Sequence, residues 1–256
     1  MKKRRQSIRR MGFLKDQEGI MNRYMRESSN WKAHLEKTRN FISTSFQQIE
    51  AESVAVLGSG WLLDVPLDYL LGRFKHIYLV DIHHPIQIRK RTAGMSQVEL
   101  IEEDLTGGAI EQVLTFLEKE APSRGGVLHG QVPLTPPLSQ ISPDVLISVN
   151  LLNQLDSIVC DHILKKKHFQ QEDLIPFRTA IQVFHLDWIS KKPGCLITDT
   201  LEEVEDKDSV KSSKALLYTD LPLGSRRDCW WWDFDFQGTY HPGSRTRMEV
   251  QAIEWL

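Results

Sequence analysis

Two short segments carry residues whose types and spacing could bind a nucleotide. Residues 53–57 are mostly apolar and β-branched and are followed directly by Gly58, Ser59 and Gly60. Glycines hold no side chain between the backbone and a ligand, so the amides at this turn could face one. Asp81 ends a second apolar run 21 residues after Gly60, at the spacing where a carboxylate accepts hydrogen bonds from ribose hydroxyls. The two segments together suggest a cofactor that contains adenosine.

Alternating strands and helices must position these residues. Continuous apolar runs predict buried strands, and amphipathic segments between them predict helices. Such alternation favours parallel strands joined by right-handed crossovers. We expect strands near 53–57, 76–80, 98–102, 144–149 and 195–199. We expect helices near 64–71, 85–93, 107–119, 151–166 and 171–189, the first capped by Asp64, started by Pro66 and ended by Gly72.

The last part of the chain has a different pattern. Apolar and polar residues alternate in 232–236 and 248–252, which is typical of half-buried antiparallel strands, and 238–245 supplies the turn. Two other segments, 123–143 and 201–227, are predicted to be irregular. The expected fold class is α/β: a doubly wound, seven-stranded, mostly parallel sheet that ends in an antiparallel β-hairpin.

The first 50 residues are expected to form an appendage to a single domain of residues 51–256. Two helices are predicted from Met21 onward, separated at Ser28-Ser29-Asn30. They either pack on the body or form a lid over the cofactor cleft. Residues 1–10 contain six of the 32 Lys and Arg residues, which leaves 26 against 34 acidic residues in the rest. The tail is interpreted as a disordered, solubilising end, with an RNA or anionic-lipid contact as the alternative.

Composition restricts the remaining possibilities. Cys160, Cys195 and Cys229 are widely separated and have no zinc-binding spacing, so no metal is expected and a reducing compartment fits best. No apolar run is long enough for a membrane span, and we expect a soluble, cytoplasmic protein. His83 and His84 are interpreted as a solvent-facing helix start. The three consecutive tryptophans, 230–232, are expected to fill the core rather than to stack on bases.

The strand order together with the glycine turn resembles the class I S-adenosylmethionine-dependent methyltransferases, over residues 53–256. The resemblance implies S-adenosylmethionine as the cofactor and a Rossmann-like methyltransferase fold. It places the methionine end of the cofactor on the turn, the ribose on Asp81 and the adenine beside the residues that follow the second and third strands. Asn150 ends the fourth strand beside the methyl group. The implied cofactor-binding residues are Gly58, Ser59, Gly60, Trp61, Asp81, Ile82, Asp104, Leu105 and Asn150.

Two departures from that family narrow the reaction. Leu62 stands where a typical loop has its third glycine, and Trp61 places an indole beside the cofactor. Asn150 is followed by two leucines instead of the Pro-Pro-Tyr of enzymes that methylate base amino groups, which argues against adenine and cytosine amino groups in nucleic acid as acceptors. A hydroxyl or carboxyl acceptor could need a base. The predicted catalytic residues are Asn150, His185 and Tyr240. The other candidates for a base are Asn153, Asp199 and His241.

The leading hypothesis is methyl transfer to a small molecule. Three alternatives stay open at this point. The chain could be a non-enzymatic, partner-binding module on the same fold, an RNA methyltransferase that uses its basic tail, or an NAD(P)-dependent oxidoreductase. The last is disfavoured because Leu63 occupies the position of the third glycine in Gly-x-Gly-x-x-Gly. The oligomeric state is not predicted.

Overall fold

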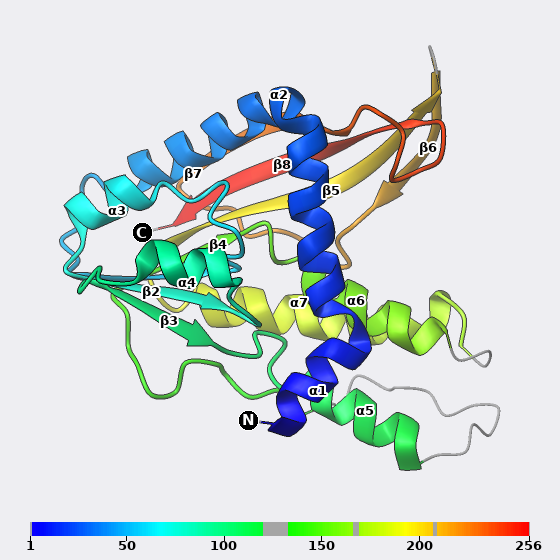
Figure 1. The fold of residues 1–256 in the computed structure, drawn as a ribbon, viewed down its shortest axis with the longest axis horizontal. Helices are drawn as coiled ribbons and strands as arrows, with labels where there is room; N and C mark the ends of the chain where they lie inside the picture. Colours follow the sequence, from blue (N-terminus) through cyan, green and yellow to red (C-terminus); the bar gives the residue numbers. More distant parts are fainter. Residues whose placement is uncertain (1, 120–132, 166–168, 207–208, 256) are drawn as a thin grey trace.

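The structure, a computed structural model, describes residues 2–119, 133–165, 169–206 and 209–255. A mixed sheet runs through the centre with helices on both faces (Figure 1). Its main path has the strand order β3-β2-β1-β4-β5-β8-β7, and β6 pairs with β5 outside this path. The doubly wound fold class with a C-terminal antiparallel pair is therefore confirmed, with one strand more than the sequence predicts.

The five parallel strands lie close to the predicted positions. Their bounds are β1 Ser53–Leu57, β2 His76–Asp81, β3 Val98–Glu102, β4 Val145–Val149 and the first part of β5 Gly194–Asp206. All five residues of β4 are buried, as are the last four of β1. Strands buried on both faces give continuous apolar runs, which is why the sequence locates them well. The order reverses between β1 and β4, and ligands bind in such sheets beyond the carboxyl ends of the strands at this point.

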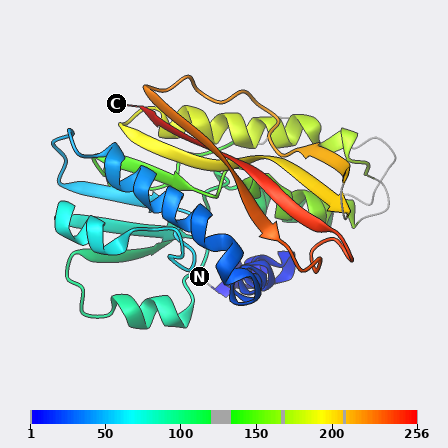
Figure 2. The same ribbon diagram turned by 90° about the horizontal axis from the view of Figure 1, so that it is seen from above.

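Helices cover the two faces of the sheet in two separate layers (Figure 2). Side chains alternate between faces along a strand, so Val54 and Val56 contact one layer and Ala55 and Leu57 the other. The first layer consists of α2 Phe13–Ser45, α3 Leu67–Arg73 and α4 Ile86–Thr92. The second layer consists of α1 Lys2–Met11, α5 Ala109–Lys119, α6 Gln154–Leu164 and α7 Ile175–Ile189, which follows the short 3-10 helix Glu172–Leu174.

The antiparallel strands at the C-terminal end are longer than predicted. They are β7 Arg226–Asp235 and β8 Arg245–Trp255. Trp230 and Trp232 are buried, as expected, but Trp231 is exposed because neighbouring residues of a strand point to opposite faces. The prediction that 201–227 is irregular is wrong in part: β5 continues to Asp206 and pairs with β6 Ser209–Ala215. Every residue of β6 is exposed, so no apolar pattern marks this strand in the sequence.

The N-terminal segment differs most from expectation. Residues 2–11 form helix α1, so the prediction of a disordered tail is wrong; Ile8 and Met11 are buried against the body. The two helices predicted after Met21 are present as the two parts of α2, which meet at a kink where the backbone of Glu27 is not helical, one residue before the predicted break. The Glu27 carboxylate accepts hydrogen bonds from the Asn30 side chain and from the Gln237 backbone. These bonds fix the kink against the C-terminal strands.

Helix α3 begins later than predicted. Pro66 is the N-cap, and Asp64 makes no cap hydrogen bond because its carboxylate binds Asn150 instead. Gly72 lies within the last turn and does not terminate the helix. Of the irregular segment predicted at 123–143, residues 123–132 lie outside the described residues, and 133–143 form no helix or strand. None of the described helices is long and apolar enough to cross a membrane.

Replacing Gly72 with alanine is expected to raise the free energy of unfolding by about 0.5–1 kcal/mol. Gly72 has helical conformation, and a Cβ atom there meets nothing within 4 Å. The substitution therefore reduces the conformational freedom of the unfolded chain without a steric cost. Urea unfolding of Gly72→Ala and wild-type protein measures the difference. A lower midpoint for the variant would contradict this local description of α3.

Candidate functional site

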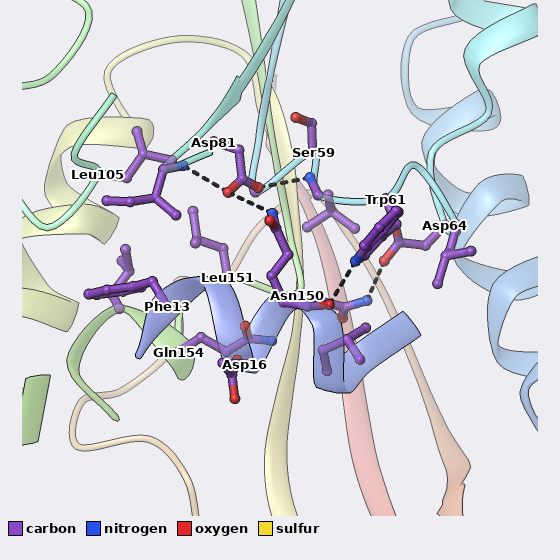
Figure 3. Close-up of a pocket in the computed structure, with 18 of the residues that line it drawn as sticks. Phe13, Asp16, Ser59, Trp61, Asp64, Asp81, Leu105, Asn150, Leu151 and Gln154 are labelled. Atoms are coloured by element: carbon purple, nitrogen blue, oxygen red, sulfur yellow. Dashed lines mark hydrogen bonds between the residues drawn. The ribbon is translucent and has the colours of Figure 1, made fainter. Parts of the chain in front are cut away.

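A cavity opens at the carboxyl ends of the parallel strands, where the strand order reverses. Its empty volume, counted with the opening to solvent, is about 1050 Å³. The loops after β1, β2, β3 and β4 form its floor and walls, and helix α2 crosses it (Figure 3). All nine residues predicted to bind the cofactor line this one cavity.

The turn after β1 brings the glycines against the neighbouring strand. The amides of Gly58 and Ser59 both donate to the Val80 carbonyl, at 3.0 and 3.2 Å. Gly58 has φ +78, and a Cβ atom at this position would lie 2.8 Å from the Val149 carbonyl oxygen. Only glycine fits there without displacement of β4. Leu62 also has a positive φ of 54, so the leucine that replaces a typical glycine adopts a conformation that glycine usually takes.

The Asp81 carboxylate lies directly beside this turn. Its Oδ2 accepts a hydrogen bond from the Gly60 amide at 2.8 Å, and its Oδ1 accepts one from the Ile82 amide at 2.7 Å. Burial raises the pKa of Asp81 to about 6, although these amides and His83 oppose the shift. A carboxylate that is fixed by two backbone donors keeps further lone pairs for a ligand in the cavity.

The first half of α2 covers this end of the cavity. The Gln17 side chain donates to the His83 carbonyl at 2.9 Å and approaches Asp81 Oδ1 at 3.5 Å. The Trp61 indole donates to the Gln17 carbonyl at 2.7 Å. Phe13, Gln17 and Ile20 thus lie over the glycine turn and Asp81. Both sequence interpretations describe part of this segment: the apolar stripe of α2 packs on the body, and the first half of the helix also covers the cleft.

The residues that follow β2 and β3 form the adjoining wall. Ile82, Asp104 and Leu105 all line the cavity. The Asp104 carboxylate accepts hydrogen bonds from the amide and the hydroxyl of Thr106, at 2.9 and 2.6 Å, which fixes the loop after β3. His83 and His84 do not form the expected exposed helix start. His84 is fully buried and contacts the Ile101 carbonyl through Nε2, and His83 contacts Glu102.

A chain of polar side chains leads from Asn150 to the C-terminal strands. Asn150 has φ +46 and donates to Asp64 Oδ2 at 2.6 Å. His34 Nε2 lies 3.5 Å from the Asn150 amide nitrogen, and His34 Nδ1 accepts a hydrogen bond from the Trp230 indole at 3.1 Å. Burial lowers the pKa of His34 to about 3, so its ring is neutral at pH 7. Burial likewise raises the pKa of Asp64.

The structure brings only one of the three predicted catalytic residues, Asn150, to the cavity. His185 is fully buried in the core, its Nε2 lies 2.9 Å from the Ser148 hydroxyl, and burial lowers its pKa to about 3. Tyr240 does not line the cavity; its ring contacts Phe234, and burial raises its pKa to about 12.

The remaining candidate bases also lie outside the lining. Asn153 and Asp199 interact with each other, and burial raises the pKa of Asp199 to about 7. His241 contacts Glu202 at 3.1 Å. None of the three lines the cavity, so none contacts a molecule in it directly.

Sequence reasoning missed every cavity residue that comes from α2, as well as Asp64 and Trp232. Trp31 and Leu35 were recognised only as part of an apolar stripe, and His34 and Gln17 have no motif around them. A polar residue beside an apolar helical stripe was the one available signal, and it is weak. The additional lining residues are Phe13, Asp16, Gln17, Ile20, Trp31, His34, Leu35, Leu63, Asp64, Glu103, Thr106, Val149, Leu151, Gln154, Leu155, Ile158 and Trp232.

Comparisons with known proteins found no relative by sequence and only distant structural matches. No family model and no curated protein matches the chain. Among solved structures, a complex of DhpI with SAM and HEP is 12% identical with a TM-score of 0.36, over 91% of this chain and 96% of that one. An rRNA methylase from Streptococcus thermophilus is 13% identical with a TM-score of 0.37, over 86% and 96%. At these TM-scores the likeness carries no conclusion about activity.

Proposed function

We propose that this chain is an S-adenosylmethionine-dependent methyltransferase that acts on a small molecule. The observation that carries the proposal is the convergence of the glycine turn, Asp81 and Asn150 on one cavity at the strand-order reversal. The proposal also agrees with a sheet of five parallel strands followed by an antiparallel pair.

The residues present fit this cofactor. Glycine leaves open space at this turn. If Gly60 carried a Cβ atom, that atom would lie 3.9 Å from Asp81 Oδ2 and would occupy the space beside the carboxylate. Ser59 is 1% exposed and lines the cavity, and its hydroxyl has no hydrogen-bond partner among the described residues. A buried hydroxyl without a partner is costly unless a ligand satisfies it. Asp81 would accept hydrogen bonds from the ribose hydroxyls, and Ile82 and Leu105 would contact the adenine.

When bound, the cofactor supplies an electrophilic methyl group on a sulfonium. The protein then mainly has to bind, align and keep water away from an acceptor. Helix α2 covers the cavity and excludes water, with the Trp61 indole bonded to its backbone. Asn150 would lie beside the methyl group, held in place by Asp64.

Isothermal titration with S-adenosylmethionine, followed by transfer of labelled methyl groups to a fractionated cell extract, tests the proposal. We expect binding, and label in a fraction of low molecular mass. No binding at millimolar cofactor would reject the proposal. Binding without any labelled product would instead support a non-enzymatic module, and label in RNA would support the RNA methyltransferase alternative.

Affinity for the cofactor is expected to fall as the pH is lowered through about 6. The pKa of Asp81 is raised to about 6, and only its ionised form accepts both ribose hydrogen bonds. Protonation therefore opposes binding below that pH, by roughly tenfold in affinity for each pH unit. Titrations between about pH 7.5 and 5 measure the effect. The residual binding of Asp81→Asn should lack this dependence, and an equal dependence in both proteins would contradict the assignment.

A further inference from the structure

The charged residues that line the cavity are acidic. Five of the lining residues are carboxylates, and none of the described lining residues is Lys or Arg. The five are Asp16, Asp64, Asp81, Glu103 and Asp104. Arg23 and Arg39 oppose the raised pKa values of Asp16 and Asp64 without themselves lining the cavity. A cavity with this lining favours positively charged groups over negatively charged ones.

The negative charge extends beyond Asn150, at the end away from Asp81. Burial is the largest cause of the raised pKa of Asp199, and a hydrogen bond from Asn153 opposes it. The charge of Asp64 is the next largest cause and adds to the rise. Two carboxylates close enough to perturb each other are stabilised when a cation lies near them. Asp199 is 5% exposed, and its Oδ1 has no hydrogen-bond partner in the described part of the chain.

Aromatic rings form the apolar wall of this end. Trp31 and Trp232 contact edge to face, with ring centroids 4.7 Å apart. His34 stacks on Trp232 at 4.0 Å with an interplanar angle of 7°. Phe234 stacks on one face of Trp31 at 5.9 Å, and His34 covers one face of Trp232, so a cation would contact the remaining face of either ring, which attracts positive charge. The Trp232 indole nitrogen is buried and has no hydrogen-bond partner among the described residues, although buried indoles usually have one.

We propose that the end of the cavity formed by Asp64, Asn150, Trp31 and Trp232 binds a small amine as the methyl acceptor. This inference rests on the proposed function, because it assigns the substrate class of the same cavity. The amine binds as an ammonium, which has no lone pair, so the Asp64 carboxylate would first accept one of its protons. The freed lone pair would then form the N–CH₃ bond as the S–CH₃ bond of the cofactor breaks, with the thioether as the leaving group. The tryptophans contact the carbon atoms attached to the nitrogen. Asn150 Oδ1 lines the same region without a partner and is a second acceptor for an N–H group.

The polar chain behind the site fixes its geometry. Because the Trp230 indole donates to His34 Nδ1, the neutral His34 ring carries its proton on Nε2. With its proton on Nε2, His34 faces the Asn150 Nδ2 atom, itself a donor, at 3.5 Å, so this contact is not a hydrogen bond. Asn150 is held by its hydrogen bond to Asp64 Oδ2 at 2.6 Å, so the carboxylate and the amide keep their positions without a ligand. Such preorganisation lowers the cost of binding.

Binding of two matched probes tests the inference. Phenethylamine and 3-phenylpropionate have a similar size and one phenyl ring, but opposite charge. We expect the amine to bind at least about tenfold more tightly than the carboxylate to protein saturated with S-adenosylhomocysteine. Ligand-observed NMR or the change in tryptophan fluorescence measures both affinities. Equal affinities, or tighter binding of the carboxylate, would overturn the inference.

Variants of two aspartates locate the effect. Asp64→Asn keeps an oxygen that can accept the Asn150 hydrogen bond but removes the charge, and it should reduce the preference for the amine by at least about threefold. Asp68→Asn, at an exposed position of α3, is the matched control and should preserve the preference. An unchanged preference in Asp64→Asn would overturn the assignment. If that variant does not fold, the comparison of the two probes on wild-type protein still tests whether the cavity prefers an amine.

Titration of the same samples with S-adenosylhomocysteine separates the two proposals. If the homocysteine compound fails to bind while the amine preference persists in the cofactor-free protein, the methyltransferase proposal fails and the cation site remains. If the compound binds but the amine preference is absent, only the amine inference fails.

Discussion

Asp81→Asn is expected to weaken S-adenosylmethionine binding by about 100-fold. The substitution replaces charge-assisted hydrogen bonds to the ribose by neutral ones, each worth roughly 1.5 kcal/mol less. It also creates a conflict within the protein. Both carboxylate oxygens accept from backbone amides, those of Gly60 and Ile82, so an amide NH₂ group in either position faces another donor. Isothermal titration at about pH 7.5, well above the raised pKa of Asp81, measures the loss.

Glu102→Gln is the matched control for this prediction. Glu102 is the direct neighbour of Asp81 in the register of β2 and β3, it ends its strand in the same way, and it does not line the cavity. Its neutralisation should change cofactor affinity by less than about threefold, the size of a partly screened charge effect. Similar losses in both variants would show that general charge near the sheet edge, rather than contact with Asp81, determines affinity.

Gly58→Ala is expected to lower the free energy of unfolding by about 2–4 kcal/mol and to abolish cofactor binding. Part of the cost is conformational, because the φ of +78 is unfavourable for residues with a Cβ atom. The rest is steric, because the new atom would lie 2.8 Å from the Val149 carbonyl oxygen and 3.0 Å from the Leu151 Cβ. Any shift that relieves these contacts moves the β1 turn away from Asp81. Urea unfolding and cofactor titration measure the two effects.

Two other glycines separate these causes. Gly94 also has a positive φ, +88, but an added Cβ atom there meets nothing within 4 Å. Gly94→Ala should therefore show only the conformational cost, about 1 kcal/mol. Gly72→Ala has neither cost. If Gly58→Ala is no less stable than Gly94→Ala, the close approach of β1 and β4 at this turn is wrong.

The parts of the fold that the sequence predicts best are those set by local pattern. Buried parallel strands and the helices between them have continuous or periodic apolar residues, and these were located within a few residues. The part of the cavity proposed to bind the cofactor follows from the same strands, since Asp81 and Asn150 occupy strand ends. Such positions are visible because the sheet fixes them relative to each other.

The parts that were missed depend on contacts between distant segments. The predicted break near Ser28 is present as the kink at Glu27, but the sequence could not show that Glu27 bonds to Gln237, 210 residues away. His185 has the residue type of a general base, but its position on α7 directs it at Ser148 in the core. Asp64 resembles a helix cap in the sequence, and only the fold places it against Asn150. The conformational preferences of a short segment do not predict its contacts with distant parts of the chain.

The contact of α2 with β7 has a consequence for how the protein is made. The Trp31 indole donates to the Phe234 carbonyl, and His34 accepts from Trp230. Residues of α2 therefore depend on residues of β7 that follow them by 203 and 196 positions and are synthesised after them. While the ribosome still holds residues 226–255, α2 lacks its binding surface, and the cavity is incomplete. Assembly of this site thus waits for the synthesis of β7, and a chain that stops before β7 would leave the apolar stripe of α2 exposed to chaperones or to aggregation.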